Sequence, residues 1–464
     1  MQRAMAWRRG PARRPVPRAA PAPGPARAAP PVPRAGPGRP GGRRGGGRPG
    51  AGPGAARGRE AGAGAGAGPE ARALPGPGPL FLRKVATLGG AKGEGGRGPW
   101  DVVGLAQAMV DYAGQVEDGF LADRGLAKGA RNIIGHEERG RFLEEVGGES
   151  FKVAPGGSLS NTLVALGRLG AASRHGGDPG SGLRVAMAGP CGNDPVGDFY
   201  RARIGKAGVE FLSEPGEGST GTVIVLTTPD AQRTMLSHGG SSEALALDAR
   251  VRAAVEGASI LLIEGYLWEM AGTVGAIREA IAAAKRAGTL VALTASDTSL
   301  VDRYRADLLD LLDGQVDILF ANGAESEALT GLADVRAASM RLAERCPLVA
   351  VTDGSKGSVL VCEGAMHLIP PYWAKDSPVD TCGAGDAYAA GVLYGLLSGA
   401  GISGIGGAGA RVASTVIGRQ GARLKVEDAE LLAGCLPSHM YDQQTVDEAN
   451  ALEQELDLRY GALS

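Results

Sequence analysis

Short apolar runs alternate with helix-like stretches from Trp100 onward, and this alternation constrains the fold more than any other feature of the chain. Between several runs, apolar residues recur at spacings of three and four, as Leu159, Leu163 and Leu166 do. Repeated β-α-β units with strands apolar on both faces predict an α/β fold, a mainly parallel sheet covered by helices on both sides. The runs are 101–105, 185–189, 260–263, 290–293, 316–320 and 348–351.

Two stretches interrupt this alternation. Residues 110–155 and 219–240 lack the helix-sheet rhythm and contain short strand-like pieces, including 221–227. They predict a small β-structured addition beside the main sheet.

The first 79 residues have a composition that cannot bury a core. They contain 15 Arg, no Lys, two Glu, 17 of the 29 prolines and a single Leu, Leu74. Three interpretations stay open: an organellar targeting segment, a basic disordered tail that contacts nucleic acid or an acidic partner, and translated sequence upstream of the functional start. The Arg-rich, acid-poor composition favours targeting, although Ser is missing. We therefore expect 1–95 to be a disordered, targeting-like segment, and 436–464 to be a polar C-terminal tail.

Charge and cysteine content exclude several function classes for the remainder. Outside the first 79 residues the chain carries 34 Lys and Arg against 48 Asp and Glu. This acidic excess disfavours direct nucleic-acid binding by the folded part, because phosphate recognition needs clustered positive charge. The chain contains no run of 18 or more apolar residues, so the sequence predicts no membrane-spanning helix. The five scattered cysteines form no CxxC pair, which excludes a standard structural zinc site and a disulfide scaffold.

The strongest local signal is the segment 380–386, Asp-Thr-Cys-Gly-Ala-Gly-Asp, which runs directly into an apolar helical stretch. Backbone N–H groups at a helix start form an anion site, and Gly383, Ala384 and Gly385 leave room for a phosphate. A carboxylate at Asp386 could take the proton of a substrate hydroxyl as its oxygen attacks phosphorus. The alternative is that Asp386 only stabilises the helix as an acid in the first turn.

Other polar loops each follow a predicted strand, where an open α/β sheet binds its ligands. Asp111 lies shortly after the first strand, and 156–161 offers close backbone approach together with the Asn161 amide. Residues 322–325 supply a carboxylate suited to a hydrated magnesium ion, and 352–357 could line a nucleotide. Five such loops together predict one ligand site.

These motifs carry a family resemblance. Residues 100–435 resemble the ribokinase-type (PfkB) carbohydrate and nucleoside kinases: 380–386 is similar to the C-terminal signature, and 156–170, continued by 189–197, to the N-terminal one. The segments 264–267, 292–297 and 349–354 are most similar to a branch of sugar kinases from cyanobacteria and plant chloroplasts.

The resemblance implies a ribokinase-like three-layer α/β/α, Rossmann-like core over 96–435, with a small β-sheet lid from about 110–155 and 219–240. It implies transfer of the ATP γ-phosphate to an alcohol group of a sugar or nucleoside. The resemblance implies Asp386 as catalytic base, with an anion hole formed by Gly383, Ala384 and Gly385, and it implies substrate contacts from Asp111, Gly157, Asn161 and Arg233. It implies nucleotide and magnesium contacts from Asn322, Glu325, Thr352, Gly354 and Gly357, with Mg²⁺ reached from Glu325 through water. It also implies a monovalent cation, K⁺, beside Asp380.

Several points stay open. The opening 104–111 is more similar to the adenosine-kinase side of the family than to the fructokinase side, but the acceptor, the nucleotide preference and the oligomeric state, including a homodimer, are not fixed by the sequence. Departures from the family pattern at 413–415 and Asp353 add to the uncertainty in nucleotide preference. The kinship favours the chloroplast stroma, with the mitochondrion or cytoplasm as alternatives. The alternative function is a kinase-fold scaffold or regulatory partner in a plastid gene-expression assembly.

Overall fold

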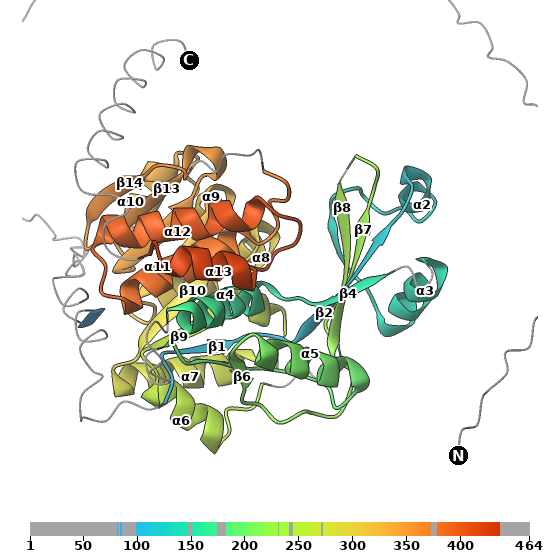
Figure 1. Cartoon of the computed structure of the whole chain (residues 1–464), viewed down its shortest axis with the longest axis horizontal. Coiled ribbons are helices and arrows are strands. Elements are labelled where there is room, and N and C mark those ends of the chain that lie inside the picture. The colour runs from blue at the N-terminus through green and yellow to red at the C-terminus, as the bar shows by residue number, and fades with distance from the viewer. Residues whose placement is uncertain are drawn as a thin grey trace, which may run out of the picture. The chain divides into compact units, whose positions relative to one another are not determined.

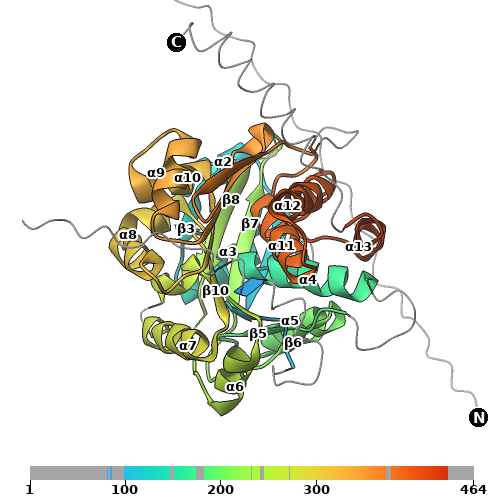
Figure 2. The same cartoon turned by 90° about the vertical axis from the view of Figure 1, so that its left-hand side faces the viewer.

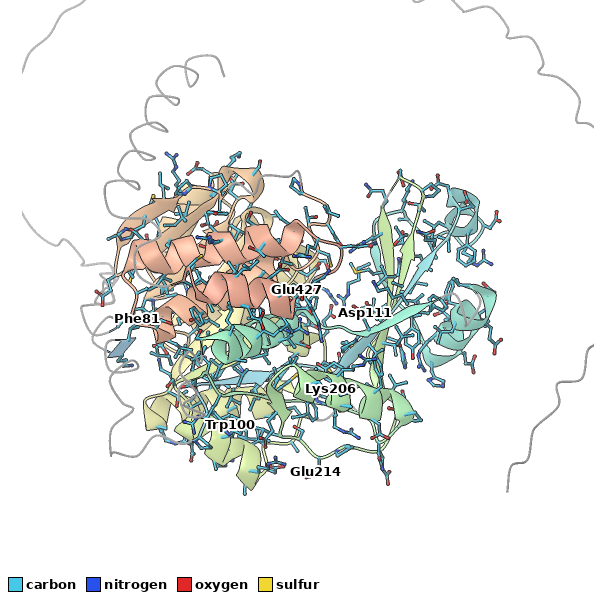
Figure 3. All side chains as sticks on the ribbon, viewed as in Figure 1. Phe81, Trp100, Asp111, Lys206, Glu214 and Glu427 are labelled. Atoms are coloured by element: carbon cyan, nitrogen blue, oxygen red, sulfur yellow. The ribbon has the colours of Figure 1, made fainter. Side chains whose placement is uncertain are left out.

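The computed structural model describes residues 81, 84–85, 99–146, 151–173, 182–230, 232–240, 245–270, 272–372 and 378–436. Most of the expected targeting-like segment and nearly all of the expected tail lie outside these residues. Phe81 and Val85, however, are buried and belong to the main hydrophobic core; Figure 3 labels Phe81. The folded part therefore takes in residues before position 96, where we expected it to begin. These two apolar side chains follow a stretch that offers little else to bury.

A nine-stranded sheet forms the centre of the fold, with the strand order β14-β13-β12-β11-β10-β9-β1-β5-β6. The strands from β6 to β12 run parallel, and β13 and β14 add an antiparallel edge. This confirms the mainly parallel sheet. The strands are β1 (Val102–Leu105), β5 (Val185–Ala188), β6 (Val209–Phe211), β9 (Ile260–Glu264), β10 (Leu290–Thr294), β11 (Ile318–Asn322), β12 (Leu348–Thr352), β13 (Ser358–Cys362) and β14 (Ala365–Ile369).

Helices cover both faces of this sheet, as Figures 1 and 2 show from two sides. In β9, Ile260 and Leu262 pack into the core on one side, while Leu261 and Ile263 pack into the core on the other. The predicted three-layer arrangement is therefore confirmed. One face carries α4 (Ser158–Ala172), α5 (Pro195–Lys206), α11 (Ala384–Leu397), α12 (Ile402–Ile417) and α13 (Val426–Ala433); the other carries α6 (Ala249–Gly257), α7 (Val274–Ala287), α8 (Thr298–Leu312), α9 (Gly323–Thr330) and α10 (Val335–Ala343), with short 3-10 turns at η1 (Gly265–Glu269) and η2 (Gly354–Lys356).

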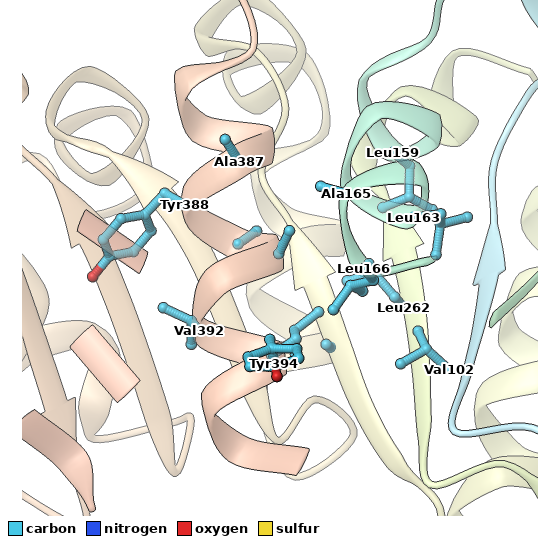
Figure 4. Packing of buried hydrophobic residues seen from close by; sticks show 14 of the residues in the cluster. Val102, Leu159, Leu163, Ala165, Leu166, Leu262, Ala387, Tyr388, Val392 and Tyr394 are labelled. Carbon is cyan, nitrogen blue, oxygen red and sulfur yellow. The ribbon is translucent and has the colours of Figure 1, made fainter. Parts of the chain in front are cut away.

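Helix α4 packs closely on the sheet because the strand beneath it carries a glycine. A Cβ on Gly104 of β1 would lie 2.5 Å from Leu163 Cδ1, so only glycine admits this leucine at its observed position. Leu159, Leu163 and Leu166 lie between α4 and the sheet, and Ala165 faces α11 (Figure 4). This packing fixes the starts of α4 and α11 side by side, and both starts contribute to the site described below.

A second, smaller sheet has the order β3-β8-β7-β2-β4. Its strands are β2 (Met109–Gln115), β3 (Arg131–Ile133), β4 (Lys152–Pro155), β7 (Gly221–Thr227) and β8 (Arg233–His238). Helices α2 (Asp118–Ala122) and α3 (His136–Val146) cover one face, where Ile224, Leu226 and Leu236 are buried. Arg131 and Arg233 lie on the opposite face and both bond to residues of the large-sheet unit, which shows that this face is turned toward the core.

Across the described ranges, no helix is both long enough and apolar enough to cross a membrane.

Candidate active site

A cavity of about 90 Å³ opens at the carboxyl ends of the central strands, where an open α/β sheet binds ligands. It lies where the start of α11 faces the start of α4 and the ends of three neighbouring strands. Its lining residues are Ser158, Thr294, Ser296, Phe320, Ala321, Asn322, Glu325, Ala350, Thr352, Gly385, Asp386 and Tyr388.

Asp386 stands in the first turn of α11, half-buried against α4. The Ser158 hydroxyl donates to Asp386 Oδ1 at 2.6 Å, and the Asn161 amide donates to Oδ2 at 2.9 Å. The Thr162 hydroxyl holds the backbone carbonyl of Asp386 at 3.1 Å. Burial raises the pKa of Asp386 to about 6, although these hydrogen bonds lower it. The carboxylate is thus ionised at neutral pH and poised to accept a proton.

The turn before α11 has the geometry of an anion site. Gly383 has a φ of +76°, and a Cβ there would lie 2.4 Å from the carbonyl oxygen of Ala422, so both backbone and space require glycine. A Cβ on Gly385 would meet nothing within 4 Å, which leaves room for a ligand to approach. The Ala384 N–H donates to the carbonyl of Thr381 at 3.3 Å. Helix geometry leaves the next N–H groups without intrahelical acceptors.

Asp111 lies where β2 enters the small sheet, between the core helices and that sheet (Figure 3). A Cβ on Gly156 would lie 2.1 Å from Asp111 Oδ1, so the carboxylate rests directly on the glycine backbone. Burial raises the pKa of Asp111 to about 6, while Arg423 and Arg233 act in the opposite direction. The polar carboxylate in this half-buried position can bind an acceptor hydroxyl.

The start of α4 carries the other residues expected to contact the acceptor. Gly157 precedes the helix with a φ of +89°, which turns the chain into α4. Asn161 lies one turn further on, and its amide is already bonded to Asp386. The sequence analysis did not assign Ser158 to the site, although this residue lies in the segment 156–161, directly after Gly156 and Gly157.

Glu264 is a second residue that sequence reasoning did not assign to the site. Its carboxylate is buried at the end of β9 and accepts the N–H of Gln107 and the N–H of Leu159, each at 3.1 Å. It therefore ties the loop after β1 to the start of α4. Burial raises the pKa of Glu264 to about 7, and the charge of Asp386 adds to this.

Asn322 and Glu325 form a capping box at the start of α9. The Asn322 N–H and amide donate to the two oxygens of Glu325 at 2.9 and 2.8 Å, and the Glu325 N–H donates to Asn322 Oδ1 at 2.9 Å. Burial raises the pKa of Glu325 to about 7. Its carboxylate lines the cavity together with Asp386, so the cavity is acidic.

These residues fit magnesium held mainly by phosphate and water. Mg²⁺ prefers oxygen ligands and usually keeps several waters, with one or two carboxylates nearby. Glu325 offers such a carboxylate in an oxygen-lined cavity. Within the described ranges no three acidic, His or Cys side chains gather as an all-protein metal cage. An anionic polyphosphate would also need this counter-charge to enter an acidic cavity.

Asp380 and Arg233 are bonded to each other, whereas the resemblance implies a monovalent cation beside Asp380 and a substrate contact for Arg233. Arg233, from β8 of the small sheet, donates to Asp380 Oδ2 at 2.6 Å. The N–H of Gly421 donates to the same oxygen at 2.8 Å, and the N–H of Cys382 to Oδ1 at 3.0 Å. These partners hold the pKa of Asp380 below its usual range against the effect of its burial. Asp380 and Arg233 are thus paired with each other in the described structure, and the monovalent cation beside Asp380 and the substrate contact of Arg233 stay predictions.

The loop after β12 contributes to the cavity through Thr352. Gly354 and Gly357 do not line it; both have positive φ, and a Cβ on Gly357 would lie 2.2 Å from the carbonyl oxygen of Ile369. They shape the turn into β13.

The structure thus brings most of the expected residues to one place. Asp386, Gly385, Asn322, Glu325 and Thr352 share the cavity. Asn161 joins them through its bond to Asp386, and Gly383 and Gly157 position the two helix starts.

Comparison with known proteins agrees with this fold. The pfkB family of carbohydrate kinases matches the chain over residues 131–429. The chain is 32% identical to the adenosine kinase of Sinorhizobium meliloti, with a TM-score of 0.65 over 73% of this chain and 100% of that structure. It is 30% identical to a probable sugar kinase of Rhizobium etli, with a TM-score of 0.64 over 73% and 99%. It is 25% identical to the ribokinase of Haemophilus influenzae over 262 residues, which is 55% of this chain and 78% of the ribokinase.

Proposed function

The chain belongs to the pfkB family of carbohydrate kinases, and on that premise we propose that Asp386 is the general base that activates the acceptor hydroxyl. The chain is an enzyme of the carbohydrate and nucleoside kinase type, with the ribokinase-like α/β fold. The observation that carries the assignment of Asp386 is its position: a half-buried carboxylate in the first turn of α11, held by Ser158 and Asn161 beside the open space over Gly385.

The proposed reaction balances through these groups. The acceptor oxygen attacks the γ-phosphorus of ATP while its proton passes to Asp386, and ADP leaves with the electrons of the broken P–O bond. The N–H groups at the start of α11 stabilise the developing negative charge on the transferring group. Kinases of this family use ATP, generally with Mg²⁺, which supplies counter-charge to the phosphates.

We propose a nucleoside as the acceptor, with adenosine the first to test. Apolar side chains lie beside Asp111 on its face of the small sheet, which also carries Arg131 and Arg233: Val223 lies directly opposite Asp111 in the β2–β7 ladder, and Ile133 and Met235 are 65% and 37% exposed. A nucleobase could cover this surface while its ribose hydroxyls bond to Asp111 and Asn161, whereas a free sugar would leave it in water. The similarity to an adenosine kinase supports the same choice.

The test is ADP release by the full chain with ATP and Mg²⁺ against adenosine, guanosine, inosine, pyrimidine nucleosides, ribose and fructose. We expect turnover with at least one nucleoside that exceeds turnover with every free sugar. Higher turnover with ribose or fructose would overturn the acceptor class but not the kinase activity.

We further propose that the protein acts in the chloroplast stroma, a proposal that rests on the composition of the first 79 residues. Import of the full chain into isolated chloroplasts, with removal of an N-terminal piece, is the expected result. The scaffold role in plastid gene expression is the alternative, and ATP binding without turnover on any acceptor would favour it. Pairing of two copies stays a prediction, which light scattering of the purified chain tests.

A further inference from the structure

Arg423 is a half-buried cation that links residues 156–161, at the start of α4, to the turn before α11. It stands between α12 and α13, directly after Gly421 and Ala422, whose backbone contacts Asp380 and Gly383. Its side chain extends toward the start of α4. Nη2 donates to the Ser160 hydroxyl at 2.7 Å and to the carbonyl of Gly156 at 3.3 Å, and Nε donates to Asn161 Oδ1 at 3.0 Å.

The bond from Arg423 to Asn161 fixes which way the amide points. An amide has one accepting oxygen and one donating nitrogen, and the guanidinium can only donate. With Oδ1 held by Arg423, Nδ2 is directed at Asp386 Oδ2, 2.9 Å away. A neutral side chain at 423 would release this constraint, and a flipped amide would place an oxygen against the carboxylate.

Arg423 also supplies positive charge to an acidic site. The charged and titratable groups that face Asp386 in the described structure are Glu264 from β9, Glu325 from α9, Cys382 from the preceding turn and Arg423. When ionised, Glu264 and Glu325 repel the ionised form of Asp386, and a single amide separates Arg423 from the Asp386 carboxylate. Burial is the largest influence on the pKa of Asp386 and raises it, while Arg423 lowers it. The charge of the Arg423 guanidinium also lowers the pKa of Asp111.

We propose that Arg423 is a positioning residue for phosphotransfer, which orients the Asn161 amide and keeps Asp386 ionised at neutral pH. The inference rests on the proposed role of Asp386 as general base. It adds to that role a dependence on a side chain that contacts neither substrate nor the reacting atoms.

The experiment compares Arg423→Gln, Arg423→Lys and the control Arg168→Gln by the pH dependence of kcat/KM for the acceptor. Arg168 is a partly buried arginine of α4 that bonds to the carbonyl of Leu424 in the same loop, so its loss loosens the loop without removing charge beside Asn161. An opposite charge near a carboxyl group lowers its pKa, and the effect falls with distance. We expect the acid limb to move up by up to about one pH unit in Arg423→Gln and to stay near its wild-type position in Arg168→Gln.

Arg423→Lys separates charge from hydrogen bonding. Lysine keeps the charge but not the fork of donors, so we expect an acid limb close to that of the wild type together with a raised KM for the acceptor. An unmoved acid limb in Arg423→Gln, or an equal shift in Arg168→Gln, would overturn the proposal. If the glutamine variant does not fold, Arg423→Met replaces it as the uncharged variant of similar volume.

A second readout does not need activity. Carbon NMR of protein labelled at the aspartate carboxyl carbons, with the Asp386 signal assigned by its loss in Asp386→Asn, follows the ionisation of this group directly. We expect its titration midpoint to rise in Arg423→Gln, and an unchanged midpoint would contradict the proposal. Absence of turnover by the wild-type chain on every acceptor would count against the proposed function, while the NMR titration would still test Arg423.

Discussion

The Ser158 hydroxyl lies 2.6 Å from Asp386 Oδ1, so a side chain of the protein itself occupies a hydrogen-bonding position at the proposed base. Ser158 also lines the cavity that holds Gly385 and Glu325. An acceptor hydroxyl must therefore share this oxygen with Ser158 or displace it. The contact joins the start of α4 to the start of α11 across 228 residues of sequence.

Ser158→Ala should raise the pH at which activity is gained. The hydrogen bond from Ser158 stabilises the ionised carboxylate and lowers the pKa of Asp386, so its removal raises that pKa and moves the acid limb of kcat/KM upward. Above the new limb, turnover should recover most of its wild-type value, because the ionised carboxylate keeps its hydrogen bond from Asn161. The pH profile is the measurement.

Thr162→Val is the matched control for that variant. Thr162 bonds to the backbone carbonyl of Asp386 and not to its carboxylate, so its hydroxyl can be lost without moving the acid limb. Equal shifts in the two variants would show that the effect comes from packing rather than from the bond to the carboxylate.

The substitution Asp386→Asn should make the free energy of unfolding less sensitive to rising pH. Because burial raises the pKa of Asp386 from 3.8 to about 6, the folded form binds this proton more tightly than the unfolded chain does. This group therefore lowers the free energy of unfolding as the pH rises from about 4 to about 6, and a neutral amide removes that loss. Thermal unfolding on both sides of this window should show a smaller decrease in the variant than in the wild type. An equal or larger decrease would contradict the buried carboxylate.

The two glycines of the anion-hole turn should respond differently to alanine. Gly383→Ala meets the carbonyl of Ala422 and a φ of +76°, so we expect a loss of stability of at least about 1 kcal/mol as well as a loss of turnover. Gly385→Ala meets nothing within 4 Å, so folding should be unaffected while turnover falls, because the methyl group enters the space left for phosphate. Chemical denaturation and steady-state kinetics separate the two. Full activity in Gly385→Ala would show that this turn does not bind the transferred phosphate.

Turnover should not require K⁺. The guanidinium of Arg233 lies 2.6 Å from Asp380 and already supplies positive charge beside this carboxylate. Replacing K⁺ by a bulky organic cation should therefore leave the wild-type rate unchanged, whereas Arg233→Gln should make the rate respond to K⁺. Strong stimulation of the wild type by K⁺ would show that Arg233 leaves Asp380 during turnover.

The sequence predicted what depends on local pattern. The alternation of apolar runs predicts the parallel sheet, and Asp386, Asn322 and Thr352 were found because each follows a strand or starts a helix. Contacts between distant segments were out of reach: Arg233 and Asp380 are 147 residues apart, and Arg423 and Asn161 are 262 apart. No local pattern distinguishes a buried arginine from an exposed one before the fold brings its partners together.

Glu264 shows the same limit from another direction. In the sequence it ends an apolar run and resembles any polar residue at the end of a strand. Only the three-dimensional arrangement brings the N–H groups of Gln107 and Leu159 to its carboxylate. Phe81 and Val85 were missed for the opposite reason, because the composition around them outweighed two apolar side chains.

The most direct test of the central claim is ADP release by the full chain and by Asp386→Asn across the nucleoside and sugar panel, with nucleotide binding measured in parallel. We predict turnover by the wild type on at least one acceptor, a decrease of at least about 100-fold in the variant, and unchanged ATP binding in both. Turnover by Asp386→Asn equal to that of the wild type would contradict the assignment of Asp386 as the general base.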